Sequence, residues 1–124
     1  MPKAYILFLD GLHKEMERLH KLLVSNGYSA SHARNLHEIF QLAKVNRPDV
    51  IVVGDDVNKH DAFKVCEELR SESDTCYANI VLLVPVVDER VRESARVAGV
   101  NDVVEKNIDA QKLLKRIEAL LGAA

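Results

Sequence analysis

Cysteine is scarce in this chain of 124 residues, which contains only Cys66 and Cys76. Two thiols are too few to form a disulfide framework, and we expect both to be free and chemically inert. A chain of this length can bury a hydrophobic core without disulfides or structural metals. We therefore expect one compact domain over residues 1–124, stabilised by apolar packing.

An excess of basic charge and long apolar runs are also absent. The formal net charge of −2 argues against a nucleic-acid-binding module, which usually carries a basic face. The longest apolar runs, such as residues 80–87, are too short to span a bilayer. No targeting segment opens the chain, since strand-like residues follow Lys3 at once. These absences predict a cytoplasmic domain that binds neither nucleic acid nor membrane.

The common motifs of catalysis and metal binding are missing as well. None of the five histidines has the HExxH or HxH spacing of a metal site. We expect His13 and His20 to be solvated, because charged residues surround them on one predicted helix. No serine lies in a GxSxG elbow, and no GxGxxG loop follows the first predicted strand. The sequence therefore does not predict an independent enzymatic activity.

What the sequence does contain is a regular alternation of short strand-like runs and longer helical ones. Tyr5–Leu9 is a nearly continuous apolar run, which is typical of a buried parallel strand. Asn35 with Glu38 three residues later predicts a capping box at a helix start. The predicted strands lie at residues 5–9, 28–33, 50–53, 80–84 and 102–105, and the predicted helices lie within 12–26, 35–44, 62–70, 91–99 and 109–121.

Five strand–helix pairs predict an α/β fold. The most favoured arrangement is the flavodoxin-like (βα)5 doubly wound sandwich, a parallel sheet of order 2-1-3-4-5 with helices on both faces. In such a sheet, ligands bind beyond the carboxyl ends of the strands, near the topological switch point. Asp10, Gly54, Val84 and Lys106 all stand at these predicted ends. A functional site is therefore sought there first.

Three stretches of the chain resemble the receiver domains of response regulators, the CheY-like family. They are PDVIVV at 48–53, DAFKVCEELR at 61–70 and AGVNDVVEK at 98–106, within a resemblance that covers residues 3–121. The resemblance implies a role in a two-component system or phosphorelay. It also implies an aspartate that accepts a phosphoryl group at the end of the third strand, beside a magnesium ion held by acidic residues.

In this chain the phosphoacceptor position implied by the resemblance is occupied by Gly54, which has no side chain to phosphorylate. The acidic pair of the family corresponds to Asp10 and Gly11, and its hydroxyl residue corresponds to Val84. The aromatic switch residue corresponds to Val103. The family's lysine corresponds to Lys106, and Asn107 stands where a proline normally follows it. Only Asp10 and Lys106 match the pattern. The resemblance therefore implies a pseudo-receiver without the phosphoacceptor.

Two alternatives remain open at this edge of the predicted sheet. A local bulge would allow Asp55 or Asp56 to act as the acceptor in a functional phosphorelay, although a shift by one residue would turn the apolar side chains of the strand to opposite faces. Asp10 and Asp56 could hold a weak magnesium ion, or Asp10 could pair with Lys106 instead. Beyond that weak site we expect no metal or cofactor.

The resemblance also implies a partner surface on the fourth helix, the fifth strand and the fifth helix. Its candidate residues are Arg90, Arg92, Arg96, Val100, Val103 and Val104. Mixed charge of this kind is also typical of a solvated helix face. We expect a phosphorylation-independent interaction or dimerisation module that binds a protein partner, an output domain or a second copy. A small ligand or anion near Lys106 is a further alternative, and the tail GAA leaves open whether the chain is a segment of a longer protein.

Overall fold

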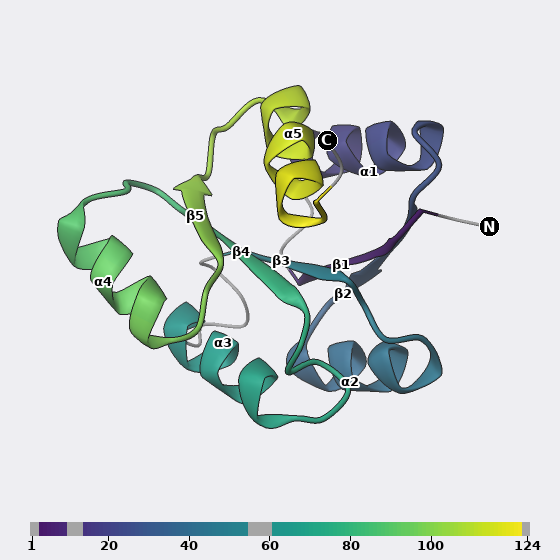
Figure 1. The fold of residues 1–124 in the computed structure, drawn as a ribbon. Helices are drawn as coiled ribbons and strands as arrows, with labels where there is room; N and C mark the ends of the chain where they lie inside the picture. The colour runs from purple at the N-terminus through teal and green to yellow at the C-terminus, as the bar shows by residue number, and fades with distance from the viewer. Residues whose placement is uncertain (1–2, 10–13, 55–60, 123–124) are drawn as a thin grey trace.

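The computed structural model describes residues 3–9, 14–54 and 61–122. The strands are β1 (Tyr5–Leu9), β2 (Ser29–Ala33), β3 (Val50–Gly54), β4 (Asn79–Val84) and β5 (Asp102–Glu105). The helices are α1 (Lys14–Ser25), α2 (Leu36–Val45), α3 (Ala62–Ser71), α4 (Glu89–Val97) and α5 (Ala110–Leu120). All strand pairs are parallel, and the sheet order β2-β1-β3-β4-β5 confirms the predicted fold (Figure 1).

The sheet separates two helical layers, because alternate residues of a strand point to opposite faces. Leu7 and Ile51 belong to one core, which α2 and α3 cover, whereas Phe8 and Val52 belong to the other, which α1 and α5 cover. Figure 1 shows α1 and α5 together on one side of the sheet and α2, α3 and α4 on the other. Every residue of β1 is buried, as expected for a strand covered on both faces.

The ends of the helices follow the predicted caps, with one difference. The Oδ1 atom of Asn35 accepts a hydrogen bond from the Glu38 amide at 2.9 Å, which confirms Asn35 as the N-cap of α2. The Glu38 carboxylate, however, accepts from the Arg34 amide rather than from the Asn35 amide of a standard capping box. Hydrogen bonds from the backbone and side chain of Arg34 lower the pKa of Glu38. Among the described residues, no helix combines the length and apolarity needed to cross a bilayer.

Arg70, near the end of α3, ties this helix to the connections that lead into β4 and β5. Its guanidinium donates to the carbonyls of Cys76 at 2.8 Å, Ala78 at 2.5 Å and Gly99 at 2.9 Å, and to the Oδ1 atom of Asn101 at 2.6 Å. Gly99 has a φ of +86°, and a Cβ atom there would lie 3.0 Å from the Arg70 side chain. The positive φ favours glycine at this turn, and a larger residue would also press on the Arg70 side chain.

Candidate functional site

The carboxyl end of β3 lies where the sequence analysis places the phosphoacceptor position. Gly54 is the last residue of β3 and is buried. The pairing of β3 with β4 runs without interruption from Val50 opposite Asn79 to Gly54 opposite Leu83. No bulge therefore displaces Gly54 within this strand, and the backbone presents a residue without a side chain at the edge of the sheet.

The neighbouring strand end is also without a reactive side chain. Val84, the last residue of β4, is 6% exposed and packs in the core layer beneath α2 and α3. Its carbonyl accepts a hydrogen bond from the Lys106 amide at 2.7 Å, which brings the residue after β5 to the same edge. The fold thus brings Gly54, Val84 and Lys106 to one edge, and of these only Lys106 has a polar side chain.

The remaining predicted residues of this edge are Asp10, Gly11, Asp55 and Asp56, which lie outside the described residues. The weak magnesium site, the alternative acceptors and the Asp10–Lys106 pair therefore stay predictions. Among the described residues, no cluster of three or more histidine, cysteine or acidic side chains could hold a metal. Gly54 and Val84 supply no side-chain oxygen, so the described part of the donor set does not fit the magnesium–phosphoryl site implied by the resemblance.

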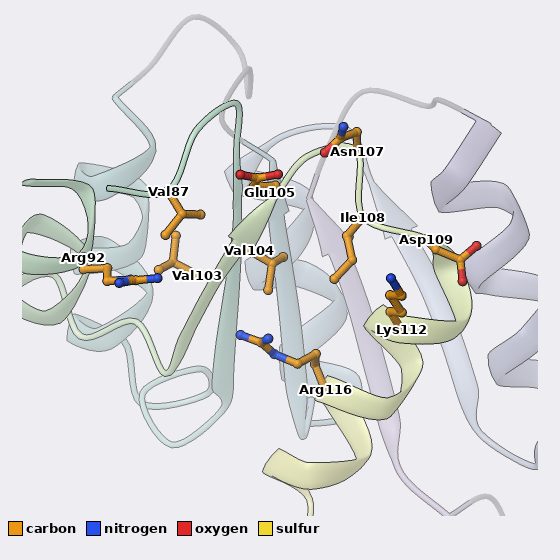
Figure 2. Close-up of a pocket in the computed structure, with 10 residues that line it drawn as sticks. All are labelled: Val87, Arg92, Val103, Val104, Glu105, Asn107, Ile108, Asp109, Lys112 and Arg116. Atoms are coloured by element: carbon orange, nitrogen blue, oxygen red, sulfur yellow. The ribbon is translucent and has the colours of Figure 1, made fainter. Parts of the chain in front are cut away.

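A second feature of this end of the molecule is a groove of about 560 Å³ between α4, β5 and α5. It is lined by Val87, Arg92, Val103, Val104, Glu105, Asn107, Ile108, Asp109, Lys112 and Arg116, and we call it the β5 groove. Figure 2 shows Arg92 extending from α4, and Lys112 and Arg116 extending from α5, with β5 between them. The groove thus combines apolar side chains with charges of both signs, because Glu105 and Asp109 line it together with the three basic residues.

The position of β5 explains why a groove forms there. β5 is the last strand in the sheet order, so it pairs with β4 on one side only. Val103 packs toward the core beneath α2 and α3, and Val104 packs toward the core beneath α1 and α5. Val104 is 4% exposed and adds little apolar area to the surface, whereas Val103 is half-buried and contributes more. An edge strand with unpaired backbone groups is a common place for another chain to dock.

An ion pair holds one wall of the β5 groove in place. Arg116 donates two hydrogen bonds to Asp102, from Nε to Oδ2 at 2.7 Å and from Nη2 to Oδ1 at 2.6 Å. Hydrogen bonding to Asp102 raises the pKa of Arg116. Paired hydrogen bonds between a guanidinium and a carboxylate restrict the geometry of both groups. The basic wall on α5 is therefore held in one orientation across β5.

The predicted partner residues lie on this side of the molecule, but they do not all face the β5 groove. Arg92, Val103 and Val104 line it. Arg96 and Val100 line a smaller depression beside it, where Arg96 is bonded to Glu93 at 2.6 Å. Arg90 is exposed and lines neither hollow. Arg92 is therefore the predicted arginine that the fold directs into the groove.

Several residues of the β5 groove were not among those predicted from the sequence. Asp109, the N-cap of α5, is followed at spacings of three and four residues by Lys112 and Arg116, which lie beside the stripe of buried Leu113 and Ile117. This helical spacing is a signal that could have identified them. Val87 and Ile108 also line the groove, but both lie in connections between elements, where no periodic pattern marks a side chain as part of a surface.

The cysteines bear out one expectation drawn from the sequence. Both thiols are free, and Cys66 is fully buried on α3. Burial raises the pKa of the Cys66 thiol to about 12. Because the thiolate is the reactive form of cysteine, Cys66 is inert at neutral pH.

Comparison with known proteins places these features in a family context. The family model described as response regulator receiver domain matches residues 6–118. Response regulator MprA from Mycobacterium sp. (strain KMS) is 34% identical over 116 residues, which cover 94% of this chain and 50% of that protein. The chain therefore spans about half the length of the curated relatives that it matches.

Solved structures share the fold at lower identity. A putative response regulator from Chloroflexus aurantiacus J-10-fl has a TM-score of 0.84 at 24% identity, over 98% of this chain and 99% of that one. The receiver domain of sensor histidine kinase PA1611 from Pseudomonas aeruginosa PAO1 has a TM-score of 0.79 at 20% identity, over 96% of this chain and 98% of that one. The latter was crystallised with a magnesium ion in its active-site cleft. At these identities the two structures support the fold alone.

Proposed function

Because this chain belongs to the response regulator receiver domain family, we propose that it acts in two-component signalling as a receiver that binds protein without accepting a phosphoryl group. The observation that carries this proposal is the position of Gly54 at the end of β3, in unbroken register with β4. A glycine offers no oxygen for phosphorylation, and Val84 on the next strand has no hydroxyl to bond a phosphoryl group. The proposal assigns the chain no catalytic role and no cofactor.

The β5 groove is the binding surface in this proposal. Its apolar side chains can exclude water from a contact, while three basic residues and the carboxylates of Glu105 and Asp109 select a partner whose charges complement this mixed pattern. A domain that is not phosphorylated has no phosphoryl group to bias it between two conformations. Recognition then depends on a surface that is held in one state. Its partners are another signalling protein, an output domain or a second copy of the chain.

The phosphorylation part of the proposal is tested with beryllofluoride or acetyl phosphate, each with magnesium, while amide shifts are followed by NMR. We expect no saturable shift at Gly54, Val84 or Lys106, because a ligand set without an acceptor carboxylate cannot complete the phosphoryl site. Saturable shifts centred on these residues in the natural chain would refute the proposal.

A restored variant provides the matched control for that experiment. It carries Gly11→Asp, Gly54→Asp and Val84→Thr, which replace the three missing acidic and hydroxyl side chains. We expect beryllofluoride to cause saturable amide shifts in this variant under conditions where it causes none in the natural chain. A response in the variant alone would assign the difference to these side chains rather than to the assay.

The alternative acceptors, Asp55 and Asp56, are tested by mass spectrometry after incubation with a small phosphodonor. The proposal predicts no gain in mass. A base-labile gain of one phosphoryl group that disappears in Asp55→Asn or Asp56→Asn would instead establish a functional phosphoacceptor. Measuring the mass of each single variant identifies which carboxylate carries the phosphoryl group.

The partner part of the proposal is tested first on a second copy of the chain, by sedimentation equilibrium over a range of protein concentrations. Reversing two charges of the groove, with Arg92→Glu and Lys112→Glu together, is expected to weaken any self-association at least tenfold, since close like charges at an interface cost several kcal/mol. The control compares Arg92→Glu alone with Arg90→Glu, because each reverses one charge and Arg90 is an exposed residue outside the groove. Equal effects of the two changes would argue for general charge repulsion and against the groove.

A further inference from the structure

Three aromatic rings stack between α1 and the β2 edge of the sheet. The His32 ring on β2 lies 4.6 Å from the Phe8 ring on β1, measured between centroids, with an interplanar angle of 15°. The His20 ring on α1 lies 5.2 Å from the His32 ring at an angle of 12°. His20 is half-buried. The expectation that it is solvated is therefore wrong, because β2 places His32 against it.

The environment of His32 is unusual for an ionisable side chain. Its Nδ1 atom is buried and has no hydrogen-bond partner, and the neighbouring Phe8 ring is fully buried. An unpaired polar atom in a protein interior is costly, and its presence in a native structure calls for an explanation. Burial lowers the pKa of His32, the proximity of His20 lowers it further, and Glu17 opposes both effects.

Among the described residues, two charged or ionisable groups act on His32, and both come from α1: His20, whose ring stacks on it, and Glu17. The Phe8 ring of β1, which stacks on the His32 ring as well, carries no charge, and α2 covers the opposite face of the sheet. Within the part of the chain that the structure describes, the His20 imidazole and the Glu17 carboxylate are therefore the charged groups that shift the pKa of His32, and both belong to α1.

We propose that His20 and His32 form a proton-sensitive contact, which holds α1 against β2 while the pair carries at most one proton and loosens this contact when both rings are charged. Both rings are half-buried, so water screens them only in part, and two imidazolium ions stacked at 5.2 Å would repel each other. β2 is an edge strand that pairs only with β1. The corner formed by α1 and β2 therefore has fewer restraints than the centre of the sheet.

The sign of the pH dependence follows from the direction of the His32 shift. Its pKa is lower in the folded chain than the ordinary histidine value of about 6.5. The unfolded chain therefore binds more protons as the pH falls below that value. The contribution of this contact to stability is present above about pH 6.5 and is lost as the pH falls toward the folded-state pKa.

The test combines NMR titration of the histidine rings with amide hydrogen exchange at pH 7 and pH 5, in buffer with EDTA to remove stray metals. After correction for the intrinsic pH dependence of exchange, we expect amides of α1 and β2 to exchange severalfold faster at pH 5 relative to amides of β4. His20→Gln should raise the titration midpoint of His32, because it removes the neighbouring charge. It should also abolish the selective loss of protection.

Two further variants keep the test decisive. His32→Phe places an uncharged ring on Phe8 and should make the protection of α1 independent of pH, even if His20→Gln folds poorly. His37→Gln removes an exposed histidine on α2 and should behave like the natural chain. A His32 midpoint that is unchanged in His20→Gln would overturn the proposal. So would an equal acid-induced loss of protection in the natural chain, His20→Gln and His32→Phe.

Discussion

Two neighbouring regions of this molecule differ sharply in chemistry, although the same sheet builds both. At the carboxyl ends of β3 and β4, Gly54 and Val84 occupy receiver positions and offer no side chain that can react or bind. One strand further along, the β5 groove combines apolar side chains of β5 and the adjoining connections with charged side chains, among them Arg92 of α4 and Arg116 of α5. Strand pairing depends on backbone hydrogen bonds and buried apolar residues, so a fold can keep the position of a site after its chemistry is lost.

The largest effect that would separate the two regions is expected from Arg70→Ala. Arg70 bonds to the turn between α4 and β5 and to the connection that leads into β4. The first of these leads directly into β5, the strand that lines the groove. Removal of the Arg70 side chain leaves several partly buried carbonyls without a donor, which should lower the free energy of unfolding by about 2 kcal/mol. Urea denaturation measures the loss, and amide shifts should change around Gly99 and Asn101 more than around Gly54.

Arg47→Ala is the matched control, because it also removes an arginine near the connection between α3 and β4. Arg47 makes one ion pair with Asp74 at 3.4 Å, and its side chain is 68% exposed. Such a pair contributes no more than about 0.5 kcal/mol. Similar losses in the two variants would show that the network of Arg70 has no special role in supporting the groove.

A smaller loss of stability is expected from Val84→Thr, which changes the strand ends at Gly54 and Val84 and leaves the β5 groove unaltered. Threonine has nearly the shape of valine, but it brings a hydroxyl into a site that is 6% exposed. A buried hydroxyl without a good partner should cost about 1 kcal/mol in urea denaturation. Val103→Thr is the control, since Val103 is half-buried and a hydroxyl there can reach water. We also expect Val84→Thr alone to gain no response to beryllofluoride, because Gly54 remains.

Much of the fold could be predicted because its signals are local. The apolar run of β1, the Asn35 cap of α2 and the spacing of the strand–helix pairs each involve residues close together in the chain. Their agreement limits the sheet to a parallel order in which β1 and β3 are central. The position of Gly54 at a strand end followed from the same reasoning, because residues on both sides restrict the register of β3.

The features that escaped prediction depend on residues far apart in sequence. His20 and His32 meet only when α1 crosses the sheet at one angle and β2 pairs with β1 in one register. The bonds from Arg70 to Gly99 and Asn101 likewise join residues about thirty positions apart, and no local pattern specifies them. The β5 groove was predictable only in part from the sequence. The spacing of Lys112 and Arg116 along α5 was visible, but Val87 and Ile108 come from connections without a periodic pattern.

The smallest effect, and the one that bears most directly on the groove, is expected from Asp102→Asn. Asp102 is 20% exposed and holds Arg116 through two hydrogen bonds, whereas the side chain of Arg116 is 50% exposed. Water screens such a pair, so its loss should lower the free energy of unfolding by only about 0.5 kcal/mol. The loss should shrink in 1 M salt, where the screening length falls to about 3 Å.

Glu89→Gln is the control for this change, because Glu89 pairs with Arg92 on the other wall at 3.7 Å with both side chains largely exposed. We expect it to alter stability less than Asp102→Asn and to show little dependence on salt. If the two changes were equal, the paired hydrogen bonds of Arg116 would confer no rigidity on the α5 wall. The contrast between the strand ends at Gly54 and Val84 and the β5 groove would then rest on the apolar side chains that line the groove, among them Val103.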